Sequence, residues 1–263
     1  MSTIQLTNVS LDYIVKNGSI SIKKATLQHL KSLLYKDTIK KNSNKNTLFR
    51  ALNNVNLNIE LGDKIGILGR NGSGKSTLLR VLARIYKPNF GALLVKGAVS
   101  NLFDVTLGLN PDANGYENIM ILGVLRGIPK KHINDLISDV ESFTELGSFL
   151  NKPVRTYSTG MRMKLAFAVA TAKESEIVLI DEVIGAGDTF FMDKATLRLN
   201  NMIENSHILV LTSHSNDIIR RFCNKVLVLD HGEVQYFGDM ETGIDWYKDF
   251  NLNTDVYKYE ELL

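Results

Sequence analysis

The chain lacks the features that mark a secreted or membrane-spanning protein. Cys223 is the only cysteine among the 263 residues, so no disulfide can form within the chain and a reducing compartment is expected. No uninterrupted apolar run reaches the roughly 18 residues that cross a bilayer. The start, MSTIQLTNVSLDY, has no charged region followed by an apolar run, as a signal peptide would. We therefore expect a cytoplasmic protein that reaches a membrane only through another chain.

The chain also lacks a large excess of charge of either sign, because its formal net charge is only +3. A nucleic-acid-binding protein usually has a much stronger basic bias, so no nucleic-acid partner is expected. The local exception is an insertion at about residues 23–47, where lysines are opposed only by Asp37 and the polar tract KKNSNKNT occurs. Such an insertion is either a solvated loop or a surface for anionic lipid headgroups or a partner.

The patterns that are present are typical of an α/β protein. Residues 3–15 and 48–62 alternate apolar and polar side chains in the manner of half-buried strands. The apolar runs in EIVLIDEV and HILVLTSHS are typical of strands buried on both faces of a parallel sheet. Residues from about 101 to 173 have a mostly helical pattern, which predicts an inserted helical subdomain, and residues from about 240 to 263 predict a peripheral tail.

The motif GRNGSGKS, Gly69 to Ser76, lies between a predicted strand and a predicted helix, which is the context of a phosphate-binding loop. Glycines let successive backbone amides turn toward phosphate oxygens, Lys75 supplies a point charge, and the Ser76 hydroxyl is a ligand for Mg²⁺. The alternative is a glycine-rich turn with a chance lysine. The predicted nucleotide-binding residues here are Gly69, Asn71, Gly72, Ser73, Gly74, Lys75, Ser76 and Thr77.

Polar side chains also follow two of the predicted buried strands. Asp181 and Glu182 end the first, at the edge of the sheet where the phosphate loop would also lie. Asp181 is predicted to hold Mg²⁺ and Glu182 to polarise the attacking water. His214 ends the second strand, from which an imidazole can reach the γ-phosphate or that water. The alternatives are solvated charges and a structural histidine.

The segment YSTGMRMKLAFAVATA, Tyr157 to Ala172, begins as a small polar turn and continues as a helix. Ser158 or Thr159 can cap this helix, and an exposed helix N-terminus is also an anion site. Because the chain already has a phosphate loop, one subunit does not need a second phosphate site. Two facing subunits would use both, the loop of one with the helix entrance of the other.

These motifs in this order, the phosphate loop, YSTGM, VLIDE, GAGD and SHS, resemble the nucleotide-binding subunit of ABC transporters. The resemblance implies a single nucleotide-binding domain over residues 1–263, with a P-loop NTPase core of ABC type, a helical subdomain and an antiparallel β subdomain. It implies an ATPase that uses ATP and Mg²⁺ and works as a head-to-tail homodimer. In such a dimer Ser158 and Gly160 contact the γ-phosphate held by the partner's Lys75.

The same resemblance assigns two further nucleotide contacts. Asp188 belongs to GAGD, which looks like the loop that crosses the dimer interface. Tyr13 matches the aromatic residue that stacks on adenine, although an ordinary core tyrosine is the alternative.

Departures from the common ABC motifs indicate a subfamily. Thr159 and Met161 replace a glycine and a glutamine of the signature, Gly185 replaces a serine, and the usual Q-loop glutamine is absent. In that region LFDVTLG places Asp104 or Val105 near the expected site, and Asp104 is our candidate metal contact. Together these features look like the subfamily that exports lipid-linked polysaccharides such as O-antigen, capsule or teichoic acid.

For such an exporter we expect a peripheral subunit on the cytoplasmic face of the inner membrane, docked on polytopic transmembrane permease subunits. We expect no carbohydrate-binding domain of the kind that some members carry, so the lipid-linked glycan would be handled indirectly. One alternative is a soluble ABC-type ATPase that acts on DNA or the ribosome, but neither a second nucleotide domain nor zinc modules nor a long coiled coil is visible. Another alternative is a nucleotide-sensing regulator without turnover, which Glu182 and His214 disfavour.

Overall fold

The computed structural model describes residues 1–15, 47–103, 105–181 and 189–260, and the side chains of 1–14, 48–103, 105–181 and 191–250. Several sequence predictions lie outside these ranges. They are the basic insertion at about 23–47 except its last residue, the metal candidate Asp104, the catalytic candidate Glu182, and the loop Gly185 to Asp188.

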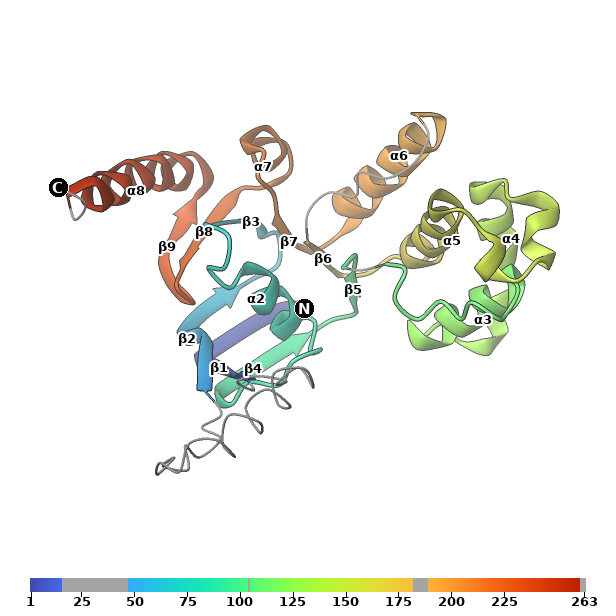
Figure 1. The fold of residues 1–263 in the computed structure, drawn as a ribbon, viewed down its shortest axis with the longest axis horizontal. Coiled ribbons are helices and arrows are strands. Elements are labelled where there is room, and N and C mark those ends of the chain that lie inside the picture. The colour runs from blue at the N-terminus through green and yellow to red at the C-terminus, as the bar shows by residue number, and fades with distance from the viewer. Residues whose placement is uncertain (16–46, 104, 182–188, 261–263) are drawn as a thin grey trace, which may run out of the picture.

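The first sheet is antiparallel and has the order β2-β1-β4 (Figure 1). Its alternating residues bury one face: Ile4, Leu6 and Leu57 are nearly inaccessible, in agreement with the period of two in the sequence. The β1 and β2 strands adjoin the insertion between them and pair from Ile4–Ile59 to Val15–Thr47, with three register shifts along the way. The strands of this sheet are β1 (Thr3–Val15), β2 (Thr47–Ile59) and β4 (Phe90–Lys96).

The second sheet has six strands in the order β5-β6-β7-β3-β8-β9, and all are parallel except β9. Its central strands are buried on both faces, which explains their continuous apolar sequences. The carboxyl ends of β3, β6 and β7 therefore meet at one edge. The strands are β3 (Lys64–Leu68), β5 (Val99–Asn101), β6 (Ile177–Asp181), β7 (Ile208–Thr212), β8 (Lys225–Asp230) and β9 (Glu233–Asp239).

Helices accompany this sheet, and the predicted α/β class is confirmed. The segment from residue 240, interpreted from the sequence as a tail, forms the helix α8, in which Trp246 stacks on Tyr236 of β9 with ring centroids 6.1 Å apart. Among the described residues, no helix is both long and apolar enough to cross a membrane. The helices are α2 (Lys75–Leu82), α6 (Thr189–Asn205), α7 (Asn216–Phe222) and α8 (Met240–Glu260).

A separate group of helices lies to one side of both sheets (Figure 1). These helices fall within the range 101–173 and pack around their own core, in which Ile119, Leu122 and Leu165 are almost fully buried. The helices are α3 (Gly115–Leu125), α4 (Ile133–Thr144) and α5 (Thr159–Thr171), with short 3-10 turns η1 (Lys130–His132), η2 (Gly147–Asn151) and η3 (Val154–Thr156).

Aromatic rings and one arginine join this group to α6. Phe143 of α4, Phe167 of α5 and Phe191 of α6 have ring centroids 5.5 to 6.1 Å apart. Arg198 of α6 places its guanidinium 4.4 Å from the centroid of the Phe143 ring and pairs with Asp139 of α4. A movement of α4 or α5 relative to α6 must therefore disturb this packed cluster.

We predict that Phe167→Ala lowers the free energy of unfolding by about 3–5 kcal/mol, because it leaves a cavity where three helices meet. Phe149→Ala is the matched control, since the Phe149 side chain is exposed and a surface substitution changes stability by roughly 0.5 kcal/mol or less. Chemical denaturation of both variants is the measurement, and equal losses would contradict the assigned packing role of Phe167.

Candidate functional site

The loop after β3 has the backbone that its glycines predict. Gly72 and Gly74 have φ angles of +82° and +106°, a region that other residues rarely adopt. An added Cβ at Gly74 would lie 2.7 Å from the carbonyl oxygen of Ala51. Gly74 is also the N-cap of α2, and no side chain caps this helix. The first amides of α2 are thus left without a side-chain acceptor, as an anion-binding helix end requires.

Polar groups in the same loop fit a phosphate. The Lys75 Nζ donates to the carbonyl oxygens of Gly69 and Arg70, at 2.7 and 2.9 Å. Ser73 Oγ is buried, and it is the one buried side-chain polar atom without a hydrogen-bond partner in the part of the chain that the structure describes. Because buried polar groups are normally satisfied, this orphan supports the interpretation of the loop as a ligand-binding segment.

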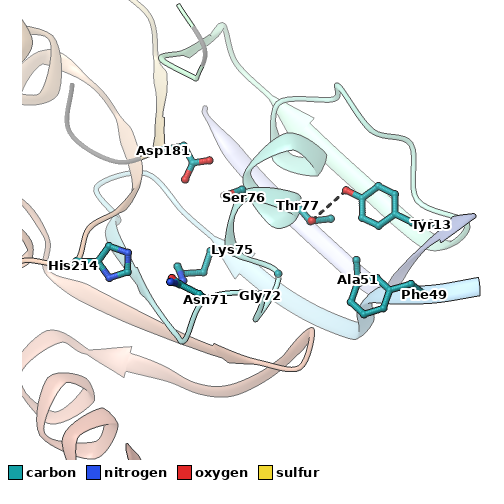
Figure 2. Close-up of a pocket in the computed structure, with 11 residues that line it drawn as sticks. Tyr13, Phe49, Ala51, Asn71, Gly72, Lys75, Ser76, Thr77, Asp181 and His214 are labelled. Atoms are coloured by element: carbon teal, nitrogen blue, oxygen red, sulfur yellow. Dashed lines mark hydrogen bonds between the residues drawn. The ribbon is translucent and has the colours of Figure 1, made fainter. Parts of the chain in front are cut away.

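A cavity of about 410 Å³ lies over the loop and collects most of the predicted site (Figure 2). Gly69 and Ser73 belong to the loop but do not line this cavity. The lining residues are Tyr13, Phe49, Ala51, Asn71, Gly72, Gly74, Lys75, Ser76, Thr77, Asp181 and His214.

Asp181 and Ser76 bring two oxygen donors to this cavity. Asp181 ends β6, is half-buried, and accepts a hydrogen bond of 2.8 Å from Thr212 Oγ1 on the neighbouring strand. Among the described residues, no cluster of three or more acidic, histidine or cysteine side chains forms a complete metal site. This sparse donor set fits Mg²⁺, which proteins usually bind through one or two side chains together with substrate phosphates.

His214 follows β7 and reaches the cavity from the opposite side to Tyr13 (Figure 2). The parallel pairing of β6 with β7 puts Asp181 in register with Thr212, so the residues just after both strands lie at the same edge. The tertiary structure thus brings His214 close to the phosphate loop, as the sequence predicted.

Tyr13 belongs to both the cavity and the core. Its hydroxyl is 3.2 Å from Thr77 Oγ1, and its ring meets Tyr86 edge-on at 5.9 Å. Burial raises the pKa of the Tyr13 phenol above its ordinary value, so the hydroxyl stays protonated at neutral pH. Tyr13 therefore packs against the hydrophobic core, as the alternative interpretation of the sequence proposed, and it also lines the cavity.

Phe49 is an aromatic residue that sequence reasoning missed. It pairs directly with Tyr13 across β1 and β2, lies in the same cavity, and is 53% exposed. Residues paired in this way share one face of a sheet, so both rings are available to a planar ligand. In the sequence, Phe49 is visible only as an aromatic residue near the start of a predicted strand. Nothing in the sequence links it to Tyr13, because the insertion separates the two residues. Ala51, also missed, contributes backbone beside Gly74.

The two signature residues lie away from this cavity. Ser158 is exposed at the N-cap of α5, where its Oγ accepts from the Met161 amide at 3.2 Å. An added Cβ at Gly160 would meet only Ser158 Oγ, at 3.8 Å, so the space beside it is open. Within one chain, Ser158 and Gly160 do not line the cavity over the phosphate loop. Their joint use in a two-subunit site stays a prediction.

Comparison with known proteins identifies the family. A model of the ABC transporter family matches residues 52–185, about half of the chain. The chain belongs to the ABC transporter family. This ABC chain is an ATP-binding protein and an ATPase, as the resemblance implied.

Among curated relatives, this ABC chain is 44% identical over 182 residues to the O-antigen export system ATP-binding protein RfbE of Yersinia enterocolitica, covering 69% of the chain and 76% of RfbE. It is 40% identical to RfbB of Myxococcus xanthus, an O-antigen export protein, over 76% of the chain and 46% of RfbB. It is 37% identical to the teichoic acids export protein TagH of Bacillus anthracis, over 80% of the chain and 38% of TagH. The ABC chain thus spans less than half the length of the last two.

Solved structures agree on the fold. A dimeric ATP-binding cassette in a post-hydrolysis state, bound to ADP and phosphate, superposes with a TM-score of 0.62 at 22% identity, covering 90% of this ABC chain and 98% of that one. The ATP-binding subunit of an ABC transporter superposes with a TM-score of 0.65 at 17% identity, covering 95% and 93%. The predicted ABC-type core is confirmed.

We predict that Lys75→Ala weakens ATP binding by roughly tenfold to hundredfold, because a charge-assisted contact to phosphate is lost. Lys64→Ala is the matched control, since the Lys64 ammonium donates to the Ile203 carbonyl oxygen and does not line the cavity. Titration with ATP is the measurement. Unchanged affinity in Lys75→Ala would remove the phosphate-loop assignment.

Phe49→Ala is expected to weaken ATP binding by roughly fivefold or more, because stacking of a base on an aromatic ring stabilises binding by about 1–3 kcal/mol. Tyr13→Phe keeps a ring and should change the affinity less. Phe90→Ala, at an exposed phenylalanine of the same sheet outside the cavity, is the control. If Phe49→Ala binds ATP as tightly as the parent chain, Phe49 is not part of the nucleotide site.

Proposed function

We propose that the chain is the ATP-hydrolysing subunit that powers export of a lipid-linked polysaccharide, such as O-antigen, capsule or teichoic acid, through a separate transmembrane subunit. The observation that carries this proposal is that relatives 37% to 44% identical are named for O-antigen or teichoic acid export. These relatives give no support to an ATPase that acts on DNA or the ribosome. The proposed location is the cytoplasmic face of the inner membrane.

In the proposed mechanism the phosphate loop binds ATP from one subunit. The backbone amides of the loop and Lys75 hold the phosphates, and Tyr13 and Phe49 hold the adenine from the antiparallel sheet. Ser76 and Asp181 would hold Mg²⁺, which neutralises phosphate charge when bound. These assignments are supported by the cavity, because the phosphate loop, Asp181 and the aromatic pair all line it.

Hydrolysis is proposed to use Glu182 and His214. Glu182 accepts a proton as water attacks the γ-phosphorus and the bond to ADP breaks, while His214 orients the γ-phosphate or the water. His214 lines the cavity. Glu182 directly follows Asp181 and lies outside the described residues, so its role is carried by the sequence. A regulator without turnover would not need this pair.

A homodimer would complete the site. Ser158 and Gly160 are exposed or open and lie away from the cavity of their own chain, which supports contact with ATP held by a second copy. Asp188 would cross between the two subunits. Polytopic permease subunits would dock on the helices α3 to α5 and on the segment around Asp104, so the chain itself would not touch the glycan.

The test is Glu182→Gln. We expect this variant to bind ATP with the parent affinity, to accumulate as an ATP-bound dimer, and to lose hydrolysis by about a hundredfold or more, since general-base catalysis contributes on the order of 10²–10⁴ in rate. Cells that carry it should keep lipid-linked glycan on the cytoplasmic face. Dimer mass, ATP turnover and glycan accessibility are the measurements.

Asp193→Asn is the matched control, because it neutralises an acidic residue of α6 that does not line the cavity. ATP turnover at the parent rate in Glu182→Gln would refute the role of Glu182. Purification of the chain with a small polytopic membrane protein supports export, whereas purification with DNA or ribosomes would refute it.

A further inference from the structure

Tyr157 and Ser158 are adjacent but differ sharply in environment. Tyr157 is only 4% exposed and belongs to the core that α3, α4 and α5 share. Ser158, the next residue, is exposed and caps α5. The backbone therefore leaves the core at this peptide bond. The contacts that hold Tyr157 in the core therefore also determine the position of the Ser158 backbone.

The Tyr157 hydroxyl is tied to a different segment of the helical group. It donates to the carbonyl oxygen of Phe149, in the turn η2, at 2.7 Å. The same carbonyl also accepts from the Lys152 amide at 2.7 Å, so it keeps a partner without the hydroxyl. Burial raises the pKa of the Tyr157 phenol, and the group remains a donor at neutral pH.

Gly115, the first residue of α3, leaves the space that this hydroxyl occupies. An added Cβ at Gly115 would lie 2.5 Å from the Tyr157 hydroxyl oxygen and 2.9 Å from the Leu150 Cα. The tyrosine tip is thus enclosed between the start of α3 and η2. A leucine or phenylalanine would fill the same pocket with carbon but would make no bond there.

The segment before Tyr157 is fixed by a second set of bonds. The Val154 amide donates to the Ala113 carbonyl oxygen at 2.9 Å, and the Arg155 amide donates to the Pro111 carbonyl oxygen at 2.8 Å. Residues 110–114 are held in turn by Asn118, whose fully buried amide donates to three of their carbonyl oxygens and accepts from the Asn110 amide. Tyr157 is the last anchored residue before the exposed N-cap.

We infer that Tyr157 is a positioning residue, whose hydroxyl bond to Phe149 sets the place of Ser158 for the nucleotide held by a second copy of the chain. The inference rests on the proposed two-subunit site. It assigns Tyr157 no contact with ATP and no part in the folding of the phosphate loop, which lies in a different part of the chain. The hydroxyl should therefore affect dimer closure and turnover but not ATP binding by one subunit.

The experiment introduces Tyr157→Phe into the full chain and into the Glu182→Gln background. We expect the ATP concentration for half-maximal dimerisation to rise roughly threefold to tenfold, and turnover to fall similarly, because a displaced Ser158 makes a weaker hydrogen bond to the nucleotide held by the second copy. ATP affinity at protein concentrations too low for dimerisation should stay at the parent value, and the melting temperature without nucleotide should fall by no more than about 2–6 °C, the cost of one lost hydrogen bond.

Tyr116→Phe is the matched control, because it removes a hydroxyl that donates to Glu141 at the surface of the same helices, and it should change none of these quantities. Parent-like dimerisation in Tyr157→Phe would overturn the inference. A lowered melting temperature with equally weakened ATP binding by single subunits would also overturn it, since that pattern indicates a general structural role. Ser158→Ala separates the two proposals. If this variant leaves ATP-dependent dimerisation and turnover unchanged, the two-subunit site itself is wrong.

Discussion

The parallel register of β3, β6 and β7 is the constraint on which the site depends. Thr212 pairs with Ile67 of β3 on one side and with Asp181 of β6 on the other. The phosphate loop begins just after β3, and Asp181 is bonded to Thr212. Because these strands are buried on both faces, a shift by one residue would exchange the side chains that pack on each face and also separate the loop from its acidic partner. Core packing and site geometry are therefore set together.

The loop is further held by elements that are distant in sequence. The Gly232 amide, in the turn between β8 and β9, donates to the Ser73 carbonyl oxygen at 2.9 Å, and the Asn53 amide of β2 donates to the Gly232 carbonyl oxygen at 2.9 Å. Gly74 lies against the Ala51 carbonyl on β2. The antiparallel sheet thus supports the loop directly, and the same sheet carries the aromatic pair of Tyr13 and Phe49 into the cavity.

The helical group carries the other half of the proposed active site. Its own core and the aromatic cluster around Phe167 make it a body that is joined to α6 at one side. Ser158 stands at its surface, and Tyr157 ties that surface residue to the interior. Such a body can approach the second subunit of the proposed homodimer without internal rearrangement.

The sequence by itself determined the α/β class, the phosphate loop, the acidic strand end and the helix entrance at Ser158. Each is a local pattern in which a few neighbouring residues set backbone and chemistry. Only the tertiary structure showed Phe49 facing Tyr13, the support of the loop by β2 and the β8–β9 turn, the helix at the end of the chain, and the anchoring of Tyr157. Those features join residues far apart in sequence, and packing and strand register bring them together, which no local pattern encodes.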